Sequence, residues 1–432
     1  DIPRNCIDFV KIFCDTLAQQ AKDGILSLLG EGIAKYFDKV YAVPRYVLYA
    51  TLNPRDVGTF PIGMPLLDRF GVAVIVESPG FEDIVSIVDI PDDKVTKRVV
   101  PSILTIDELV EIWGYVWATP LSEDSALFIS TLVKELSLCD RVSKETGVFL
   151  TMGSKICSGC HFEPLDVTCK MVYTPLSIRA QKDLVRYSKA LSWLLGLREV
   201  PLSVVVSIAP YVLWHRIRFA EKYLEKRYYN KFELTKEIVS IILRNFLQRL
   251  PIIRAFEGLK RGEIDTNMVV AIRNMARNDL IIKHEFAPKL DILLDDKYVA
   301  FASSLVASIE GRDRDAIVDI LENAQNDLSR EQYEALYSVY EIELRRNMKK
   351  IVTSYSAWRD KIDEISRIIG NKGIIDTLSP PKAIRISLGV EYLEVCTFDD
   401  KDDSPVFVMV YSLWDDLTEK LAGLLGCECR SS

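Results

Sequence analysis

The stretch that decides the fold is YVLYATLNPRDVGTFPIGMPLLDRFGVAVIV, residues 46–76. It opens with a β-rich apolar run, Tyr46–Tyr49, and closes with a second one, Val72–Val76. Short apolar runs bounded by glycine and proline are typical of buried strands in a mostly parallel sheet. Asn53 lies just past the first run, and ligands dock at the carboxyl ends of strands in open α/β sheets. The stretch therefore predicts two core strands with a polar group at a ligand-binding edge.

Composition is that of an ordinary globular protein. The 432 residues are 49% hydrophobic and 27% charged, which allows two or three domains. The net charge of −8 gives no argument for nucleic acid or an anionic membrane as a partner. The longest apolar run, 200–214, contains two prolines and is too short to span a bilayer, so no membrane insertion is expected. Nine cysteines, an odd count, favour a reducing cytoplasm over a secreted disulfide framework.

The motifs ATLNP, GTFP and LLDRF follow one another within residues 50–70. In this order they resemble the sensor-1 to arginine-finger segment of AAA+ ATPases, specifically the MoxR branch and its relative, the magnesium-chelatase ATPase subunit. Before them, the pieces IAKYF and VYAVP in residues 33–44 alternate in polarity and predict a β-hairpin. This hairpin resembles the pre-sensor-1 insertion of that clade. A surface hairpin without a role is the alternative.

The first residues also resemble that family. Asp1-Ile-Pro-Arg-Asn is similar to the segment that follows the Walker B strand in MoxR proteins, which implies that Asp1 is the last Walker B acid. The phosphate-loop pattern G-x-x-x-x-G-K-[ST] occurs nowhere in the sequence. The expectation is a chain truncated at Walker B, with its phosphate-loop part missing. Residues 6–29 then carry apolar side chains at helical spacing and predict a helix packed on the sheet.

Residues 101–220 predict an α-helical lid. Residues 106–117 and 122–139 have amphipathic helical spacing. Further on, Ser177-Ile-Arg179-Ala resembles the sensor-2 motif of MoxR proteins, and the resemblance ends near residue 220. His215 is interpreted as a packing or capping histidine rather than a ligand.

A cysteine cluster lies inside the expected lid. Cys157 and Cys160 form a C-x-x-C pair, followed directly by His161 and then by Cys169. Thiolate and imidazole groups at such spacing suit tetrahedral Zn²⁺, with His161 or Cys139 as the fourth ligand. Plain buried thiols are the main alternative, and a redox pair or a c-type haem attachment site are further ones.

Residues 221–432 match no family domain that we can name. Apolar spacing predicts helices near 266–277 and 298–309 and one long helix across 330–369. The apolar runs within 384–414, separated by an aspartate-rich turn, predict a β-hairpin before a last helix.

The expected fold class is therefore an α/β partial P-loop (AAA+) core, an α-helical lid, and a mostly helical C-terminal domain with a β-hairpin. The corresponding domains are residues 1–100, 101–220 and 221–432.

The resemblance assigns roles to individual residues. It implies that Asp1 activates water or reaches Mg²⁺, and that Asn53 orients the attacking water or touches the γ-phosphate. Arg69 is the arginine finger, a planar and permanently charged donor that acts on a neighbour's nucleotide. Arg179 pairs with phosphate in its own chain. Asp68 holds Arg69 or bridges the subunit interface.

The implied activity is ATP hydrolysis coupled to remodelling or maturation of a protein partner, often one with a von Willebrand A domain. ATP and Mg²⁺ would be held largely by the missing part, and Zn²⁺ by the cysteine cluster. A finger that acts on a neighbour requires a ring, and the resemblance implies a hexamer. The alternative is a non-catalytic ring or scaffold subunit that keeps the interface and does not hydrolyse ATP.

Overall fold

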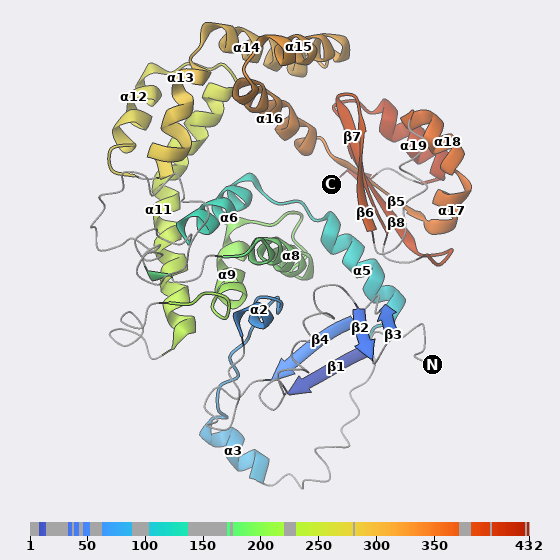
Figure 1. Cartoon of the computed structure of the whole chain (residues 1–432). Coiled ribbons are helices and arrows are strands. Elements are labelled where there is room, and N and C mark those ends of the chain that lie inside the picture. Colours follow the sequence, from blue (N-terminus) through green and yellow to red (C-terminus); the bar gives the residue numbers. More distant parts are fainter. Residues whose placement is uncertain are drawn as a thin grey trace.

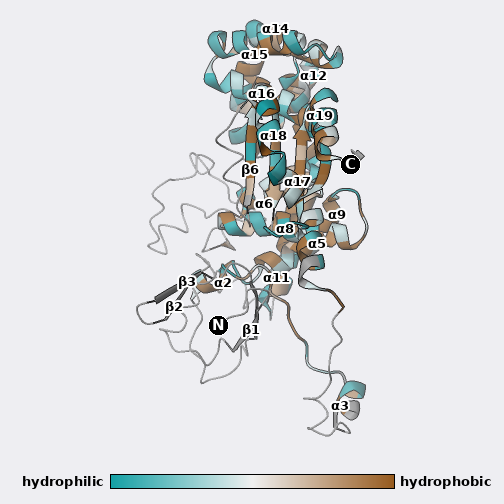
Figure 2. Ribbon diagram, turned by 90° about the vertical axis from the view of Figure 1, so that its right-hand side faces the viewer, coloured by the Kyte–Doolittle hydropathy of each residue, from teal (hydrophilic) through white to brown (hydrophobic). Residues whose placement is uncertain are grey.

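The computed structural model describes most of the chain, with gaps. The described residues are 8–13, 33–36, 39–42, 46–51, 63–88, 103–136, 171–172, 176–219, 230–279, 281–370, 382–397, 400–427 and 430–431. Helices form the middle of the molecule, between short N-terminal strands and a C-terminal sheet (Figure 1). Figure 2, turned by 90°, again places α3 and α14 at opposite ends. Within the described ranges, no helix combines the length and apolar composition that crossing a bilayer requires.

The N-terminal strands form two separate pairs. Strand β1 (Asp8–Phe13) runs parallel to β4 (Tyr46–Thr51), and β2 (Ile33–Tyr36) pairs antiparallel with β3 (Lys39–Ala42). The predicted strand at Tyr46 and the predicted hairpin are thus confirmed. The helix predicted across 6–29 is wrong at its start, because DFVKIF is a strand. A six-residue run rich in β-branched and aromatic residues fits a strand as well as a helix, and helical spacing alone could not decide.

The next residues that the structure describes, 63–88, form no strand. They contain α2 (Met64–Leu67), in which Leu66 is buried, and α3 (Phe81–Val88). The second core strand predicted at Val72–Val76 is wrong, because these residues form no strand and Val76 is 91% exposed. The Ala73 N–H instead donates to the carbonyl of Tyr211, so the segment is bonded to the helices.

Helices α6 (Glu123–Glu135), α8 (Ile178–Leu194) and α9 (Leu202–Leu213) make the first helical core, and α5 (Ile106–Ala118) lies against α8. The helices predicted from 106, from 122 and around Arg179 are confirmed. Hydroxyl side chains accept backbone N–H groups at the starts of three of them, which satisfies donors that a helix leaves unpaired. The caps are Thr105, Ser122 and Ser177.

Helix α11 (Lys231–Lys260) is 30 residues long and belongs to two cores. Up to Ile253 its buried side chains pack with α6, α8 and α9, and from Phe256 they pack with the helices that follow. The second core consists of α12 (Thr266–Met275), α13 (Leu290–Leu293), α14 (Asp296–Glu310), α15 (Arg314–Asp327) and α16 (Arg330–Arg346). A short π-helix (Ile282–Phe286) and a 3₁₀ turn (Ala287–Lys289) precede α13. Helix α11 therefore runs without a break through both cores. The predicted domain limits at residues 100 and 220 stay predictions.

The long helix predicted across 330–369 is wrong. Helix α16 ends at Arg346, and a strand, β5 (Lys349–Ser354), separates it from α17 (Tyr355–Asp360) and α18 (Ile362–Ile369). Strand β5 has the sequence KKIVTS, in which Ile351 and Thr353 are buried and their neighbours less so. Alternating burial with β-branched residues is the signature of a strand.

The C-terminal sheet has the strand order β6-β7-β8-β5-β9, and all its paired strands are antiparallel. Besides β5 it contains β6 (Lys382–Leu388), β7 (Glu391–Thr397), β8 (Pro405–Tyr411) and β9 (Arg430–Ser431). The predicted hairpin is confirmed as part of this larger sheet, and the predicted last helix is α19 (Asp416–Leu425). Helices α18 and α19 pack with the sheet in one hydrophobic core.

The sheet also contacts the first helical core, through α5. Tyr115 meets Phe407 edge to face, with ring centroids 5.6 Å apart, and the Lys350 ammonium lies 4.9 Å from the Tyr115 ring centroid. Gly114 permits this approach, since a Cβ at that position would lie 1.8 Å from the ring of the fully buried Phe407. Glycine within a helix weakens it, so close packing is the physical reason for a glycine here.

We expect Gly114→Ala to destabilise the protein by about 1–3 kcal/mol, because the added methyl group overpacks a filled contact. Gly423 is the matched control. It also lies inside a helix, α19, but is exposed with no atom within 4 Å of an added Cβ, so Gly423→Ala should stabilise by about 0.5–1 kcal/mol. Urea unfolding of both variants measures the two effects. Equal changes of the same sign would contradict the packing described here.

Candidate functional site

The structure describes three of the residues that the sequence predicts for a nucleotide site, and it brings two of them together. Asp68 and Arg179 are in contact, and Arg69 follows Asp68 directly. The predictions for Asp1 and Asn53, and for the cluster of Cys157, Cys160, His161 and Cys169, lie outside the described residues. Among the described residues, no group of three or more His, Cys, Asp or Glu side chains is placed to hold a metal ion.

Asp68 lies at the start of α8 and contacts it twice. The Ser177 hydroxyl caps the helix by accepting the Ala180 N–H at 3.2 Å, and donates its proton to Asp68 Oδ1 at 2.6 Å. Arg179 Nη1 lies 3.4 Å from Asp68 Oδ2. A carboxylate is favourable at a helix N-terminus, where the backbone dipoles leave partial positive charge. Asp68 therefore joins the LLDRF segment to the motif that resembles sensor 2.

Arg69 does not pair with Asp68. Its Nη1 donates to the Pro65 carbonyl at 2.7 Å, one turn earlier in the chain, and its buried Nε has no hydrogen-bond partner in the part of the chain that the structure describes. The expectation that Asp68 holds Arg69 is therefore wrong in this structure, because the carboxylate is occupied by Ser177 and Arg179.

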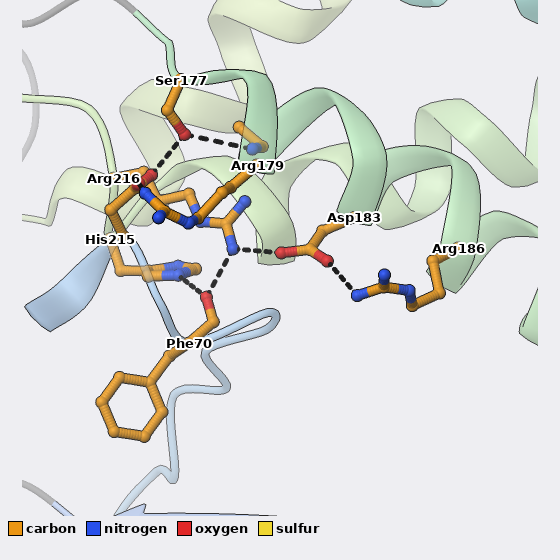
Figure 3. A network of polar contacts seen from close by, with 9 residues as sticks. Phe70, Ser177, Arg179, Asp183, Arg186, His215 and Arg216 are labelled. Carbon is orange, nitrogen blue, oxygen red and sulfur yellow. Dashed lines mark hydrogen bonds and ion pairs between the residues drawn. The ribbon is translucent and has the colours of Figure 1, made fainter. Parts of the chain in front are cut away.

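The backbone just after Arg69 is bonded to the end of α9. The Phe70 carbonyl accepts hydrogen bonds from His215 Nε2 at 2.8 Å and from Arg216 Nη2 at 2.7 Å (Figure 3). Three residues later, the Ala73 carbonyl accepts the indole N–H of Trp214 at 2.8 Å. This loop is therefore fixed at its carbonyl groups by side chains from one short stretch, residues 214–216.

Arg216 is the buried charge of the site. Its side chain is 1% exposed, and Nη2 also pairs with the Asp183 carboxylate, which in turn accepts from Arg186 at 3.0 Å (Figure 3). A buried guanidinium needs an opposite charge, and Asp183 on the inner face of α8 supplies it. The pairing of Arg216 with Asp183 was not predicted from the sequence. The available signal was Asp183 next to Leu184 on the apolar face of the predicted helix.

Gly71 allows the loop to approach α8. A Cβ at Gly71 would lie 2.3 Å from the Tyr187 hydroxyl, so any side chain there would have to displace the ring or the loop. Burial raises the pKa of Tyr187, which keeps its hydroxyl protonated. The glycine of the LLDRFG stretch thus has a packing reason in this structure.

His215 is neutral in this environment. Its pKa is lowered to about 4, and burial is the largest cause. The bond to the Phe70 carbonyl opposes this shift, whereas the positive charges of Arg216 and Lys231 add to it. Because a carbonyl can only accept, Nε2 carries the proton of the neutral ring. The interpretation of His215 as a packing or capping residue is consistent with this geometry.

The arrangement presents one exposed guanidinium beside a carboxylate at a helix N-terminus. Arg179 is 54% exposed and Asp68 is 19% exposed, so the pair faces solvent on the arginine side. A guanidinium in this position can bind a phosphate group bidentately, and the N-terminal end of the helix favours the same anion.

Comparisons with known proteins give a distant structural similarity. No family model and no curated protein matches the chain. Among solved structures, a 2.00 Å crystal structure of a protein from Cytophaga hutchinsonii, described as a "putative ATPase", is similar with a TM-score of 0.41 and 21% identity. The match covers 55% of this chain and 64% of that protein. At this TM-score the likeness carries no argument about function.

The depressed pKa of His215 makes stability depend on pH. Between the unfolded-state pKa near 6.5 and the folded value of about 4, the unfolded chain binds more protons, so the free energy of unfolding falls as pH falls. We expect a loss on the order of 3 kcal/mol from this group across that window. His215→Gln can still donate to Phe70 and does not titrate, so it should lack this component.

The measurement is urea unfolding of wild type and His215→Gln at pH values from 7 to 4. Their difference isolates the histidine from the carboxylates, which titrate in both proteins. His284→Gln is the control and should keep the steep wild-type dependence. Identical pH profiles for wild type and His215→Gln would contradict the assignment of a buried neutral ring.

Proposed function

We propose that the chain is part of a MoxR-like AAA+ ATPase that couples ATP hydrolysis to remodelling or maturation of a protein partner. One observation supports this above the others. The LLDRF and SIRA motifs, which resemble the arginine-finger and sensor-2 motifs of that family, meet through Asp68 although Asp68 and Arg179 are 111 positions apart. Two motifs that were identified separately in the sequence thus lie in direct contact at the start of α8.

Arg179 is proposed to pair with nucleotide phosphate in its own chain. Its side chain is exposed and begins from the first turn of α8, and among the described residues it has one carboxylate partner, at 3.4 Å. A bidentate contact with phosphate, with two parallel hydrogen bonds from the planar guanidinium, is stronger than this single, solvent-exposed contact. A phosphate would therefore replace Asp68 at little cost.

Arg69 is proposed to act on a neighbour's nucleotide. Its present acceptor is the neutral Pro65 carbonyl, and a hydrogen bond with one charged partner contributes about 1.5–3 kcal/mol. The gain from stabilising charge on a transferred phosphoryl group is larger, since arginine fingers contribute roughly 10³–10⁵ in rate. The rate gain therefore outweighs the free energy lost when Arg69 leaves the Pro65 carbonyl.

The phosphate loop is not among the 432 residues, so the proposal requires other residues to hold ATP and Mg²⁺. Asp1 and Asn53 keep their proposed roles beside that loop, in activating and orienting water. A hexameric ring, a client with a von Willebrand A domain and a cytoplasmic location belong to the same proposal. A scaffold subunit that does not hydrolyse ATP is the competing function.

We expect Arg69→Ala to lower ATP turnover by about 10³-fold or more in a ring that carries the phosphate loop, with nucleotide affinity nearly unchanged. Arg69→Lys should rescue poorly, because one ammonium cannot reproduce the planar fork. Mixing Arg69→Ala subunits with Asp1→Asn subunits should restore part of the activity, from interfaces that pair an intact site with an intact finger. Steady-state ATPase assays on the mixture measure this.

Arg330→Ala is the control, because Arg330 is exposed on α16 and bonds only to Glu334 among the described residues. It should retain wild-type turnover. Residues 1–432 alone should hydrolyse no ATP. Mixed rings that form and stay inactive would show that Arg69 does not act across the interface. Rings without turnover even in the wild type would favour the scaffold function.

We also propose one Zn²⁺ at Cys157, Cys160 and Cys169, with His161 as the candidate fourth ligand. Thiolates at C-x-x-C spacing support this proposal. Elemental analysis of purified protein should give stoichiometric zinc, and Cys157→Ser with Cys160→Ser should lose it. Cys396→Ser is the control, since Cys396 is a buried free cysteine on β7. Wild-type protein without zinc would leave plain thiols as the interpretation.

A further inference from the structure

A short loop that carries Arg69 is bonded to the lid of its own chain. We call residues 66–73 the finger segment. Its polar contacts with the lid join Asp68 to Ser177 and Arg179, the Phe70 carbonyl to His215 and Arg216, and Ala73 to Tyr211 and Trp214. All these partners come from the start of α8 or from the end of α9 and the turn after it. The β4 strand, which precedes the segment in sequence, is not among them.

These contacts are of two kinds. The Phe70 carbonyl accepts from both Arg216 and His215, two buried side chains, so detaching it would break two hydrogen bonds and leave the Arg216 guanidinium with Asp183 alone. The contact of Asp68 with Arg179 is long and open to solvent, and such pairs contribute little to stability. The finger segment is thus held firmly at Phe70 and Ala73, whereas its contact with Arg179 can be exchanged.

The exchangeable contact lies next to Arg69. Asp68 caps the C-terminal end of α2, and Arg69 Nη1 is bonded to Pro65 in the first turn of the same helix. Helix α2, Asp68 and Arg69 therefore form one small unit. Loss of the Arg179 contact would leave this unit attached to the start of α8 through Ser177 alone, while Phe70 stays bonded to Arg216.

We propose that Arg216 and Asp68 are positioning residues for the finger. Arg216 fixes the finger segment to the lid, and Asp68 adjusts Arg69 according to whether Arg179 holds a phosphate group. A phosphate bound by Arg179 takes the guanidinium from Asp68, which then keeps only Ser177. The finger that a subunit presents would in this way report phosphate binding in the same subunit. The role of Arg69 rests on the proposed function, but the docking of the segment does not.

Hydrogen exchange on residues 1–432 tests the docking without any activity. The Ala73 amide is protected by Tyr211, so peptides covering 66–76 report on the attachment. Asp68→Asn keeps an acceptor for Ser177 and loses the ion pair, and exchange in this peptide should rise about two- to fivefold. Arg216→Lys keeps a positive charge near Asp183, but the lysine side chain is shorter and loses the Nη2 group that bonds both Asp183 and the Phe70 carbonyl. It should raise exchange more, with α8 amides unchanged.

Asp83→Asn is the matched control, because Asp83 is an exposed aspartate that bonds to the Gly80 N–H outside the finger segment. It should leave the 66–76 peptide at the wild-type rate. Sodium tripolyphosphate, compared with sodium chloride at equal ionic strength, should reproduce the effect of Asp68→Asn in wild type. It should have no effect on Arg179→Gln. Wild-type exchange rates in both Asp68→Asn and Arg216→Lys would overturn the proposal.

ATPase assays on a ring that carries the phosphate loop can distinguish a failure of this inference from a failure of the proposed function. Asp68→Asn should lower kcat severalfold without raising KM for ATP, because it alters the finger and removes a competitor of phosphate for Arg179. If Arg69→Ala abolishes turnover while Asp68→Asn is wild type in both assays, the inference fails and the function stands. If exchange responds as expected but Arg69→Ala hydrolyses ATP normally, the docking stands and the proposed function fails.

Discussion

The buried guanidinium of Arg216 is the constraint on which the arrangement of the site depends. A charge that is almost fully removed from water is tolerated only with an opposite charge and with hydrogen-bond acceptors around it. Asp183 supplies the charge from α8, and Phe70 supplies a backbone carbonyl from the finger segment. Because the arginine itself follows α9, three stretches of chain must meet at this point. The positions of Asp68 and Arg69 follow from that meeting.

A second buried arginine connects the two helical cores in the same manner. Arg249 on α11 pairs with Glu135 at the end of α6 and with Asp279 after α12. Burial alone would lower the pKa of Arg249, but the two carboxylates outweigh burial and raise it. Removing either carboxylate would leave charge buried without its full complement. Since α11 also continues without a break from one core into the other, the helical cores are held together by both charge and backbone.

The sequence predicted what depends on neighbouring residues and failed where distant contacts decide. Helix α8 was predictable because Ser177 caps it and its apolar spacing is regular. Val72–Val76 has the composition of a strand, but hydrogen bonds from the end of α9 hold Ala73 instead. Asp68 and Arg179 were identified through motifs, and their contact was not. The pairing of Asp183 with Arg216 spans 33 positions and could not be read from either local pattern.

Helix α8 also extends from the site toward the C-terminal sheet. Ten residues after Arg179, the Lys189 ammonium donates to the Trp117 carbonyl at the end of α5, at 2.7 Å. Burial lowers the pKa of Lys189 to about 8, and Glu394 on β7 raises it, so the ammonium lies within the influence of the sheet. The same end of α5 packs against Met348 and Met409. A tilt of α8 that follows a change at Arg179 would therefore strain contacts of β7 and β8, which gives the C-terminal sheet a physical connection to the candidate site.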